Sequence, residues 1–141
     1  MLINPQIQVT ARPNPQVELG PVDCSCAILL CDLQQPDYPV VYASEAFCDL
    51  TGYALTEILG RNCRFLQSPD GKVKPKSPRA HVDKDVIRKM RKAVDKNEEI
   101  QTKVVNFKKG GYPFNNLLTI IPIRWDSRDF RYSVGFAVEA D

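Results

Sequence analysis

The chain has 141 residues, of which 43% are hydrophobic, and this suits a single domain with a buried core. Its formal net charge is +2, and its cations are mostly interleaved with acids, so no basic stripe indicates nucleic-acid binding. No apolar run reaches the roughly 18 residues that span a membrane, and no secretory signal opens the sequence, so we expect a soluble cytoplasmic or nuclear protein.

Cysteine spacing restricts the chemistry of the chain. The count of five is odd, no two cysteines form a C-x-x-C pair, and His81 is the one histidine. These features exclude structural zinc and a secreted disulfide framework, and they favour reduced thiols. The cysteines are Cys24, Cys26, Cys31, Cys48 and Cys63.

The first segment, residues 1–23, carries four prolines, a density that blocks a long helix and favours extended conformations. Ile3, before the first of these prolines, and Ile7 and Val9, after it, offer apolar contacts to a packed partner. We therefore divide the chain into an arm of residues 1–23 and a domain of residues 24–141. The arm is expected either to dock on the domain or to be a disordered tail.

Short strands and helices are expected after the arm. The apolar run 26–31 predicts a buried strand, and a proline-containing turn leads to a second strand at 40–43. Ser44 is suited to cap a short helix that Gly52 ends, and a further helical turn is expected at 56–60. These elements should hold the segment that follows at a stiff corner of the domain.

That segment is an octapeptide at 60–67, Gly-Arg-Asn-Cys-Arg-Phe-Leu-Gln. It sets Cys63 between Arg61 and Arg64 and places the amide of Gln67 four residues later. The flanking cations should favour the thiolate of Cys63 over its thiol, and the thiolate is the reactive form. The alternative is that Cys63 is a small buried apolar residue and that both arginines are solvated.

A long loop and a helix follow the octapeptide. The length of the loop at 68–82 predicts a functional or a disordered segment. Its cations are the densest in the chain: Lys72, Lys74, Lys76 and Arg79. Asp83 is expected to cap a helix to Lys96 whose apolar stripe faces the core. Arg91 stands beside that stripe, where a surface position and a ligand contact are equally compatible with the pattern.

Three strands are expected to complete the domain, at 100–107, 112–123 and 130–138. A two-residue turn between the first two would send Asn106 and Asn116 to opposite faces of the sheet, whereas a three-residue turn sends both to one face. The longer turn also gives Gly111 the left-handed conformation that such hairpins favour, so we predict this register. The two amides then lie roughly 7 to 8 Å apart.

The octapeptide and the order of elements resemble the light-oxygen-voltage (LOV) branch of the PAS sensor family, over about Cys26 to Val138. In detail the chain is similar to small fungal photoreceptors of the Vivid and Envoy type. The resemblance implies an α+β fold, with a five-stranded antiparallel sheet, helices on one face and an amino-terminal cap. It also implies a blue-light photoreceptor, not an enzyme, in which Cys63 forms a reversible bond to C4a of a flavin.

The resemblance further implies which residues hold the flavin. Side-chain amides complement the carbonyl and N–H groups along the ring edge, and these amides belong to Asn62, Gln67, Asn106 and Asn116. Arg64 and Arg91 match phosphate-binding arginines, and the loop that contains Arg79 would house the adenosine part of FAD, with FMN as the other possible flavin. The ring faces would be covered by Leu29, Leu66 and Leu118, which suit ordinary core positions equally well.

One position departs from the family pattern. Most LOV domains carry a glutamine on the last strand that responds to protonation of the flavin, and Ala137 stands there in this chain. We therefore expect flavin binding and bond formation to be retained, but the signal to the arm to be weakened or rerouted. Cys26 is a second relay candidate. Cys48 and Cys24 are candidates for an intermolecular disulfide, with buried packing as the alternative for Cys48.

Two other classes of function are alternatives to the photoreceptor. A catalytic Cys63 with His81 as base is disfavoured, because the cysteine-phosphatase pattern needs an arginine where Pro69 stands. A PAS module that binds a ligand or responds to redox conditions without photochemistry fits the same fold but does not require Cys63. The photoreceptor hypothesis predicts a light- or redox-dependent homodimer, a role in photoadaptation, and a larger LOV-containing transcription factor as partner. It predicts no metal and no direct contact with nucleic acid or membrane.

Overall fold

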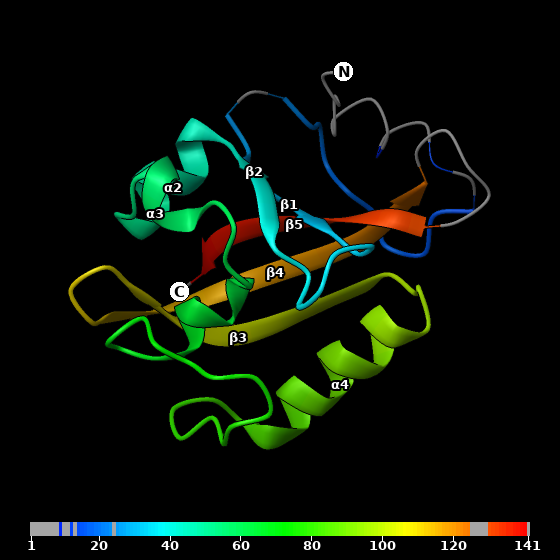
Figure 1. Ribbon diagram of the computed structural model, residues 1–141. Coiled ribbons are helices and arrows are strands. Elements are labelled where there is room, and N and C mark those ends of the chain that lie inside the picture. Colours follow the sequence, from blue (N-terminus) through cyan, green and yellow to red (C-terminus); the bar gives the residue numbers. More distant parts are fainter. Residues whose placement is uncertain (1–8, 10–11, 13, 24, 125–129, 141) are drawn as a thin grey trace.

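The computed structural model describes residues 9, 12, 14–23, 25–124 and 130–140, and its centre is a five-stranded antiparallel sheet in the order β2-β1-β5-β4-β3 (Figure 1). The strands are β1 (Ala27–Asp32), β2 (Val40–Ala43), β3 (Ile100–Lys108), β4 (Tyr112–Arg124) and β5 (Phe130–Ala140). Between β2 and β3 the chain forms α2 (Glu45–Thr51), α3 (Leu55–Ile58), the 3₁₀ helix η1 (Cys63–Gln67) and α4 (Lys84–Asp95). The predicted α+β fold is confirmed.

Side-chain caps explain where two of the helices begin. The hydroxyl of Ser44 accepts a hydrogen bond from the Phe47 amide at 3.2 Å, and Asp83 accepts one from the Asp85 amide at 2.7 Å. Gly52 ends α2 in the left-handed conformation, with φ of 79°. The caps predicted at Ser44, Gly52 and Asp83 are therefore confirmed. Within the described ranges, no helix has the length and apolarity that a membrane crossing requires.

The hairpin between β3 and β4 has the predicted three-residue turn. Asn106 pairs with Phe114, and Val104 pairs with Asn116. Gly111 has a φ of 89°, a value that favours glycine over residues with a side chain. Because residues two apart on a strand share a face, Asn106 and Asn116 lie on the same side of the sheet.

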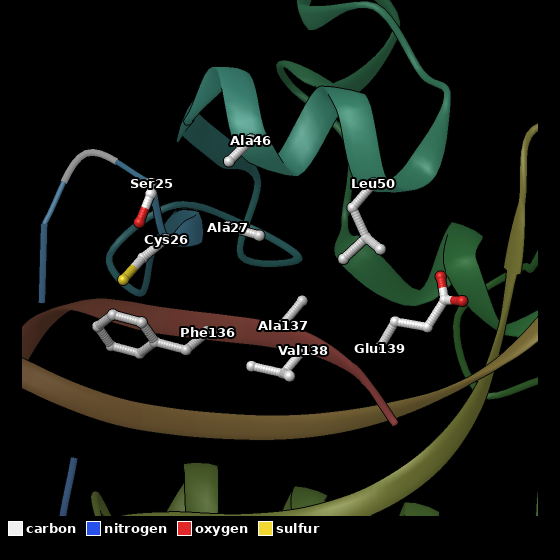
Figure 2. A pocket seen from close by; sticks show the side chains of 9 residues that line it. All are labelled: Ser25, Cys26, Ala27, Ala46, Leu50, Phe136, Ala137, Val138 and Glu139. Atoms are coloured by element: carbon white, nitrogen blue, oxygen red, sulfur yellow. The ribbon is translucent and has the colours of Figure 1, made fainter. Parts of the chain in front are cut away.

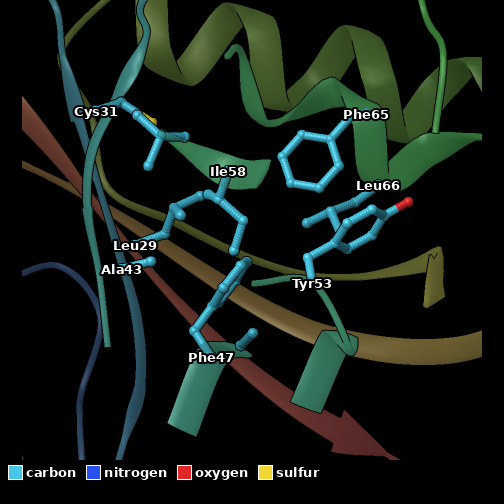
Figure 3. Packing of buried hydrophobic residues seen from close by; sticks show 10 residues of the cluster. Leu29, Cys31, Ala43, Phe47, Tyr53, Ile58, Phe65 and Leu66 are labelled. Atoms are coloured by element: carbon cyan, nitrogen blue, oxygen red, sulfur yellow. The ribbon is translucent and has the colours of Figure 1, made fainter. Parts of the chain in front are cut away.

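The two faces of the sheet pack against different parts of the chain. One face supports the helices, and Figure 3 shows Leu29 and Cys31 of β1 in a cluster with Phe47, Ile58 and Phe65. The opposite face carries a second buried cluster that includes Ile28, Leu30, Val134 and Phe136. This second cluster is covered by Val9, Leu19 and Val22. The described part of the arm is therefore docked on the sheet, on the face that the helices leave open.

A buried ion pair fastens the arm to the domain. Arg12 Nε lies 2.7 Å from Glu99 Oε2, and the two side chains are only 10% and 8% exposed. The other carboxylate oxygen of Glu99 accepts hydrogen bonds from the backbone amides of Gln16 at 2.9 Å and Val17 at 2.8 Å. Glu99 stands directly before β3, so the arm is held at the start of that strand.

Candidate functional site

Cys63 is the first residue of η1, and hydrogen bonds to β2 fix the backbone that leads to it. The amide of Val40 donates to Arg61 O at 2.8 Å, and the amide of Gly60 donates to Val40 O at 2.9 Å. Asn62 then caps η1 by accepting from the Arg64 amide at 2.9 Å. Cys63 is therefore presented from a rigid corner, and as a residue it is exposed.

The thiol of Cys63 lies beside the buried thiol of Cys31, and this proximity shifts the pKa values of the two thiols in opposite directions. The hydrogen bond from Cys31 lowers the pKa of Cys63, and the nearby Arg64 guanidinium lowers it further. For Cys31 the same hydrogen bond, together with burial, raises the pKa of the thiol well above its usual range. Cys63 is thus the more nucleophilic sulfur of the pair.

Only one of the two flanking arginines acts on Cys63 in the way the sequence predicts. Arg64 lowers the pKa of Cys63, although its guanidinium also forms an ion pair with Asp37. Arg61 instead stacks over the ring of Phe65, with 4.6 Å between Cζ and the ring centroid, and donates to Gly71 O at 2.6 Å. Arg61 is therefore a packing residue that holds η1 against the following loop.

Three arginines gather where the loop at 68–82 meets η1 and α4. Burial lowers the pKa of Arg79, and repulsion from Arg64 and Arg91 lowers it further. Arg79 Nε donates to Gln67 Oε1 at 2.9 Å, and both residues line a hollow of about 120 Å³. Because guanidinium groups that repel each other are stabilised by a bound anion, this corner suits phosphate groups. The structure thus brings together the three arginines named in the sequence analysis.

Asn106 and Asn116 form a polar pair on the face of the sheet that supports the helices. Asn116 Nδ2 donates to Asn106 Oδ1 at 2.8 Å, and Asn116 and Asn106 are 1% and 4% exposed. Asn116 Oδ1 also accepts from the Val138 amide at 3.1 Å. The helix η1 packs against β3, so these amides share one side of the sheet with Cys63 and Gln67. Asn62 differs, because its amide group donates to Asp37 O at 2.7 Å while its oxygen caps η1.

Two small residues of β5, Gly135 and Ala137, lie beside the leucines Leu29 and Leu118 that the resemblance names. A Cβ added at Gly135 would lie 3.8 Å from Leu29 Cβ and 3.9 Å from Leu118 Cδ1, which are ordinary contact distances. Ala137 is paired with Leu118 on one side and with Ala27 on the other. The buried amides of Asn106 and Asn116 beside these apolar residues fit the polar edge of an isoalloxazine ring. The arginine cluster fits the phosphates of a flavin nucleotide. Leu66, the third leucine, is buried in the cluster under the helices.

A cavity of about 400 Å³ opens beside Ala137, between β5, α2 and the start of β1 (Figure 2). Its lining is mostly apolar and includes Cys26, Leu50, Phe136 and Val138. Cys26 Sγ lies 3.8 Å from Pro21 O at the end of the arm. The two relay candidates, Ala137 and Cys26, therefore line the same cavity, which lies next to the point where the chain enters β1.

Cys48 and Cys24 are the two candidates for an intermolecular disulfide. Cys48 is half-buried on α2, and burial followed by repulsion from Asp49 and Glu45 raises the pKa of its thiol. Cys24 lies outside the described residues. Among the residues that the structure describes, no group of three His, Cys, Asp or Glu side chains could hold a metal ion.

Sequence reasoning missed two residues of the site, Cys31 and Asp37. Cys31 lies two positions after Leu29, so the alternation along a strand could have placed it on the same face. Asp37 sits in the turn between β1 and β2 with a φ of 63°, and no local pattern connects it with Arg64, which is 27 residues away.

Comparisons with known proteins agree with this geometry. The family model of the PAS domain matches residues 25–139. The blue light receptor lreA of Aspergillus flavus is 49% identical over 132 residues, which are 94% of this chain and 15% of lreA. The White collar 1 protein of Neurospora crassa is 46% identical over 131 residues, which are 93% of this chain and 11% of that protein. The chain thus spans a small part of these two relatives.

Solved structures of the fungal photoreceptor Vivid match over a larger share of both chains. The photo-excited form of this blue-light photoreceptor is 63% identical, with a TM-score of 0.91, and the match covers 95% of this chain and 91% of that chain. The light-state dimer of Vivid is 64% identical, with a TM-score of 0.90, and the match covers 94% and 90%.

Proposed function

We propose, from the premise that this chain belongs to the LOV branch of the PAS domain family, that it is a blue-light photoreceptor which binds a flavin. In light, the Cys63 thiol would form a reversible bond to C4a of the ring. The observation that carries the proposal is the placement of this thiol. Cys63 has a lowered pKa, starts a rigid helix, and lies on the side of the sheet that carries the buried Asn106–Asn116 pair.

The residues of the chain have separate tasks in this function. Asn106, Asn116 and Gln67 would hold the polar edge of the ring, since an amide can both donate and accept. Leu29 and Leu118 would cover its faces and exclude water. A thiol held against the ring has the proximity that a thiol in solution lacks, and it is regenerated in the dark, so no substrate is turned over.

We infer that the flavin is FAD, because the arginine cluster extends into the hollow of the loop at 68–82. FMN carries one phosphate, which Arg64 and Arg91 can bind together. Arg79 stands further along, where it contacts Gln67 and lines the hollow together with Lys72 and His81. A second phosphate with its adenosine would fit this additional cationic position.

Replacing Arg79 with alanine is expected to weaken FAD binding about 10- to 100-fold. This change corresponds to the loss of one hydrogen bond to a charged group, which contributes about 1.5–3 kcal/mol. FMN binding should change little. Arg88→Ala is the matched control, because the Arg88 side chain is 75% exposed and pairs only with Asp85 among the described residues. Titration of flavin-free protein with each flavin measures both affinities. Equal losses of affinity for FAD and FMN would contradict the proposal that Arg79 binds the second phosphate of FAD.

The output proposed for light is a change in the arm and in protein association. The arm covers the sheet face behind the flavin site, so a shift of β5 would reach Val9, Leu19 and Val22 directly. A light-state dimer is known for Vivid, and a light-dependent homodimer is proposed here by analogy. The proposed second partner is a larger LOV-containing transcription factor, since White collar 1 includes a region similar to this chain. A role in photoadaptation would follow from such a partner.

The test of the proposed function is the visible spectrum of protein purified in the dark, together with chromatography of the cofactor released by denaturation. We expect FAD with a structured absorption band that bleaches under blue light and recovers in the dark. A protein without flavin, or with flavin that never bleaches, would instead support the second candidate, a PAS module that works without photochemistry.

A further inference from the structure

Cys31 and Cys63 are 32 positions apart in the sequence, but backbone pairing brings them together. Cys31 is the ladder partner of Val40, and Val40 donates its amide hydrogen to Arg61 O. Cys63 follows two residues after Arg61, at the start of η1. The side chain of Cys31 lies in the buried cluster of Figure 3, and its thiol is close enough to that of Cys63 for each to shift the pKa of the other.

The two sulfurs differ in the properties that matter for oxidation. As a residue Cys63 is exposed, and its pKa is lowered, so it is the sulfur of the pair that we expect to react first with a small oxidant. Cys31 is 8% exposed and its pKa is raised, so it stays a thiol and is shielded from solvent. A thiolate on an exposed residue beside a thiol on a buried residue is an arrangement in which a first oxidised sulfur is resolved by its neighbour.

We propose that Cys31 and Cys63 form an intramolecular disulfide when the protein meets a peroxide. In the first step the Cys63 thiolate attacks one peroxide oxygen, the O–O bond breaks, and the sulfur becomes a sulfenic acid while hydroxide or alkoxide leaves. In the second step the Cys31 sulfur attacks Cys63 Sγ, and the S–O bond breaks. The proton of Cys31 leaves with the hydroxyl group as water, so two thiols have lost two electrons to one peroxide.

The other described cysteines lack this arrangement. Cys48 is half-buried on α2 and has a raised pKa, which disfavours attack on peroxide. Cys26 stands at the cavity beside Ala137, with its sulfur 3.8 Å from Pro21 O. Among the described cysteines, Cys31 and Cys63 are therefore the pair for which a disulfide is expected.

The disulfide would block the light reaction of Cys63 under oxidising conditions. This consequence rests on the proposed function, because it assumes that the Cys63 thiol reacts with flavin in light. A sulfur bound to Cys31 has no thiol to add to the ring, so the oxidised protein would keep its flavin and lose its bleaching. Reduction of the disulfide by a dithiol would restore the response.

The test uses the flavin-loaded protein, kept dark, treated with hydrogen peroxide, and compared with Cys31→Ser and with Cys48→Ser as the matched control. After alkylation of remaining thiols and digestion without reductant, mass spectrometry should find the Cys31 peptide linked to the Cys63 peptide with the loss of two hydrogen atoms. Cys48→Ser should give the same linked peptide. Cys31→Ser should instead carry added oxygen on Cys63, which dithiothreitol does not remove once sulfinic acid has formed.

Bleaching measured on the same samples separates the two proposals. Peroxide should abolish bleaching of the unsubstituted protein, and dithiothreitol should restore it. If untreated protein never bleaches, the proposed function fails, but the peptide map still decides whether the disulfide forms. Oxidation of Cys63 that leaves Cys31 fully alkylated in the unsubstituted chain would overturn the disulfide, whatever the folding of the Cys31→Ser variant.

Discussion

Replacing Glu99 with glutamine is expected to lower the free energy of unfolding by about 3 kcal/mol and to release the arm from the sheet. Glu99 and Arg12 are 8% and 10% exposed, so the substitution leaves the guanidinium of Arg12 buried without its counter-charge. The estimate is at the low end for a broken buried ion pair, because glutamine keeps an oxygen that can accept from the amides of Gln16 and Val17.

Denaturant unfolding and limited proteolysis of the arm measure the two effects of Glu99→Gln. Glu98→Gln is the matched control, since Glu98 is the preceding residue and is exposed. Equal stability and equal protease resistance of the two variants would show that the ion pair does not hold the arm. Faster cleavage of the arm in Glu99→Gln, but not in Glu98→Gln, would show that the Arg12–Glu99 ion pair holds the arm on the sheet.

The same ion pair predicts a dependence of arm docking on pH. Burial of Glu99 opposes its ionisation, but the hydrogen bonds from Arg12, Val17 and Gln16 outweigh burial and hold its pKa below the usual value. A lowered folded-state pKa contributes stability above the unfolded pKa of about 4.3, and this contribution is lost as pH falls through the folded value. Arm cleavage by an acid-stable protease should therefore increase on acidification in the unsubstituted protein and less in Glu99→Gln.

Replacing Ala137 with glutamine is expected to strengthen light-induced association about tenfold, the equivalent of about 1.4 kcal/mol, or one net hydrogen bond. Ala137 is 6% exposed and lines the cavity of about 400 Å³ that also contains Cys26, so the longer side chain has room. Its amide could exchange donor and acceptor roles when the flavin is protonated, and alanine offers neither. Size-exclusion chromatography in the dark and in blue light measures the association.

Ala137→Leu is the control for this prediction, because leucine fills the same cavity without a hydrogen-bonding group. If leucine and glutamine strengthen association equally, the gain comes from packing and not from a polar relay. If neither variant differs from the unsubstituted protein, the signal reaches the arm by a route that does not use position 137.

Local chemistry in the sequence was sufficient to predict the elements that position the site. The caps at Ser44 and Asp83 depend on residues within three positions, and the turn that sets Asn106 and Asn116 on one face depends on Gly111. Such short-range rules carry over from sequence to structure, because the interacting atoms are held close by the chain itself.

Contacts between distant segments could not be predicted in this way. The pairing of Arg12 with Glu99 spans 87 positions, and the strand pairing that sets Val40 opposite Cys31 contains an irregular register between Leu30 and Cys31. A shift in the pairing of β1 with β2 changes which residue of β2 lies opposite Cys31, and no pattern in the sequence predicts this shift. The sequence therefore indicated a reactive Cys63 but not the second thiol that lowers its pKa.

The most direct test of the photochemical role of Cys63 is the blue-light difference spectrum of the flavin-loaded protein beside Cys63→Ala, with Cys48→Ala as the matched control. We predict that the unsubstituted protein and Cys48→Ala bleach and recover in the dark, whereas Cys63→Ala binds flavin and does not bleach. Reversible bleaching of Cys63→Ala with the same spectral change would contradict the assignment of the light-driven bond to Cys63.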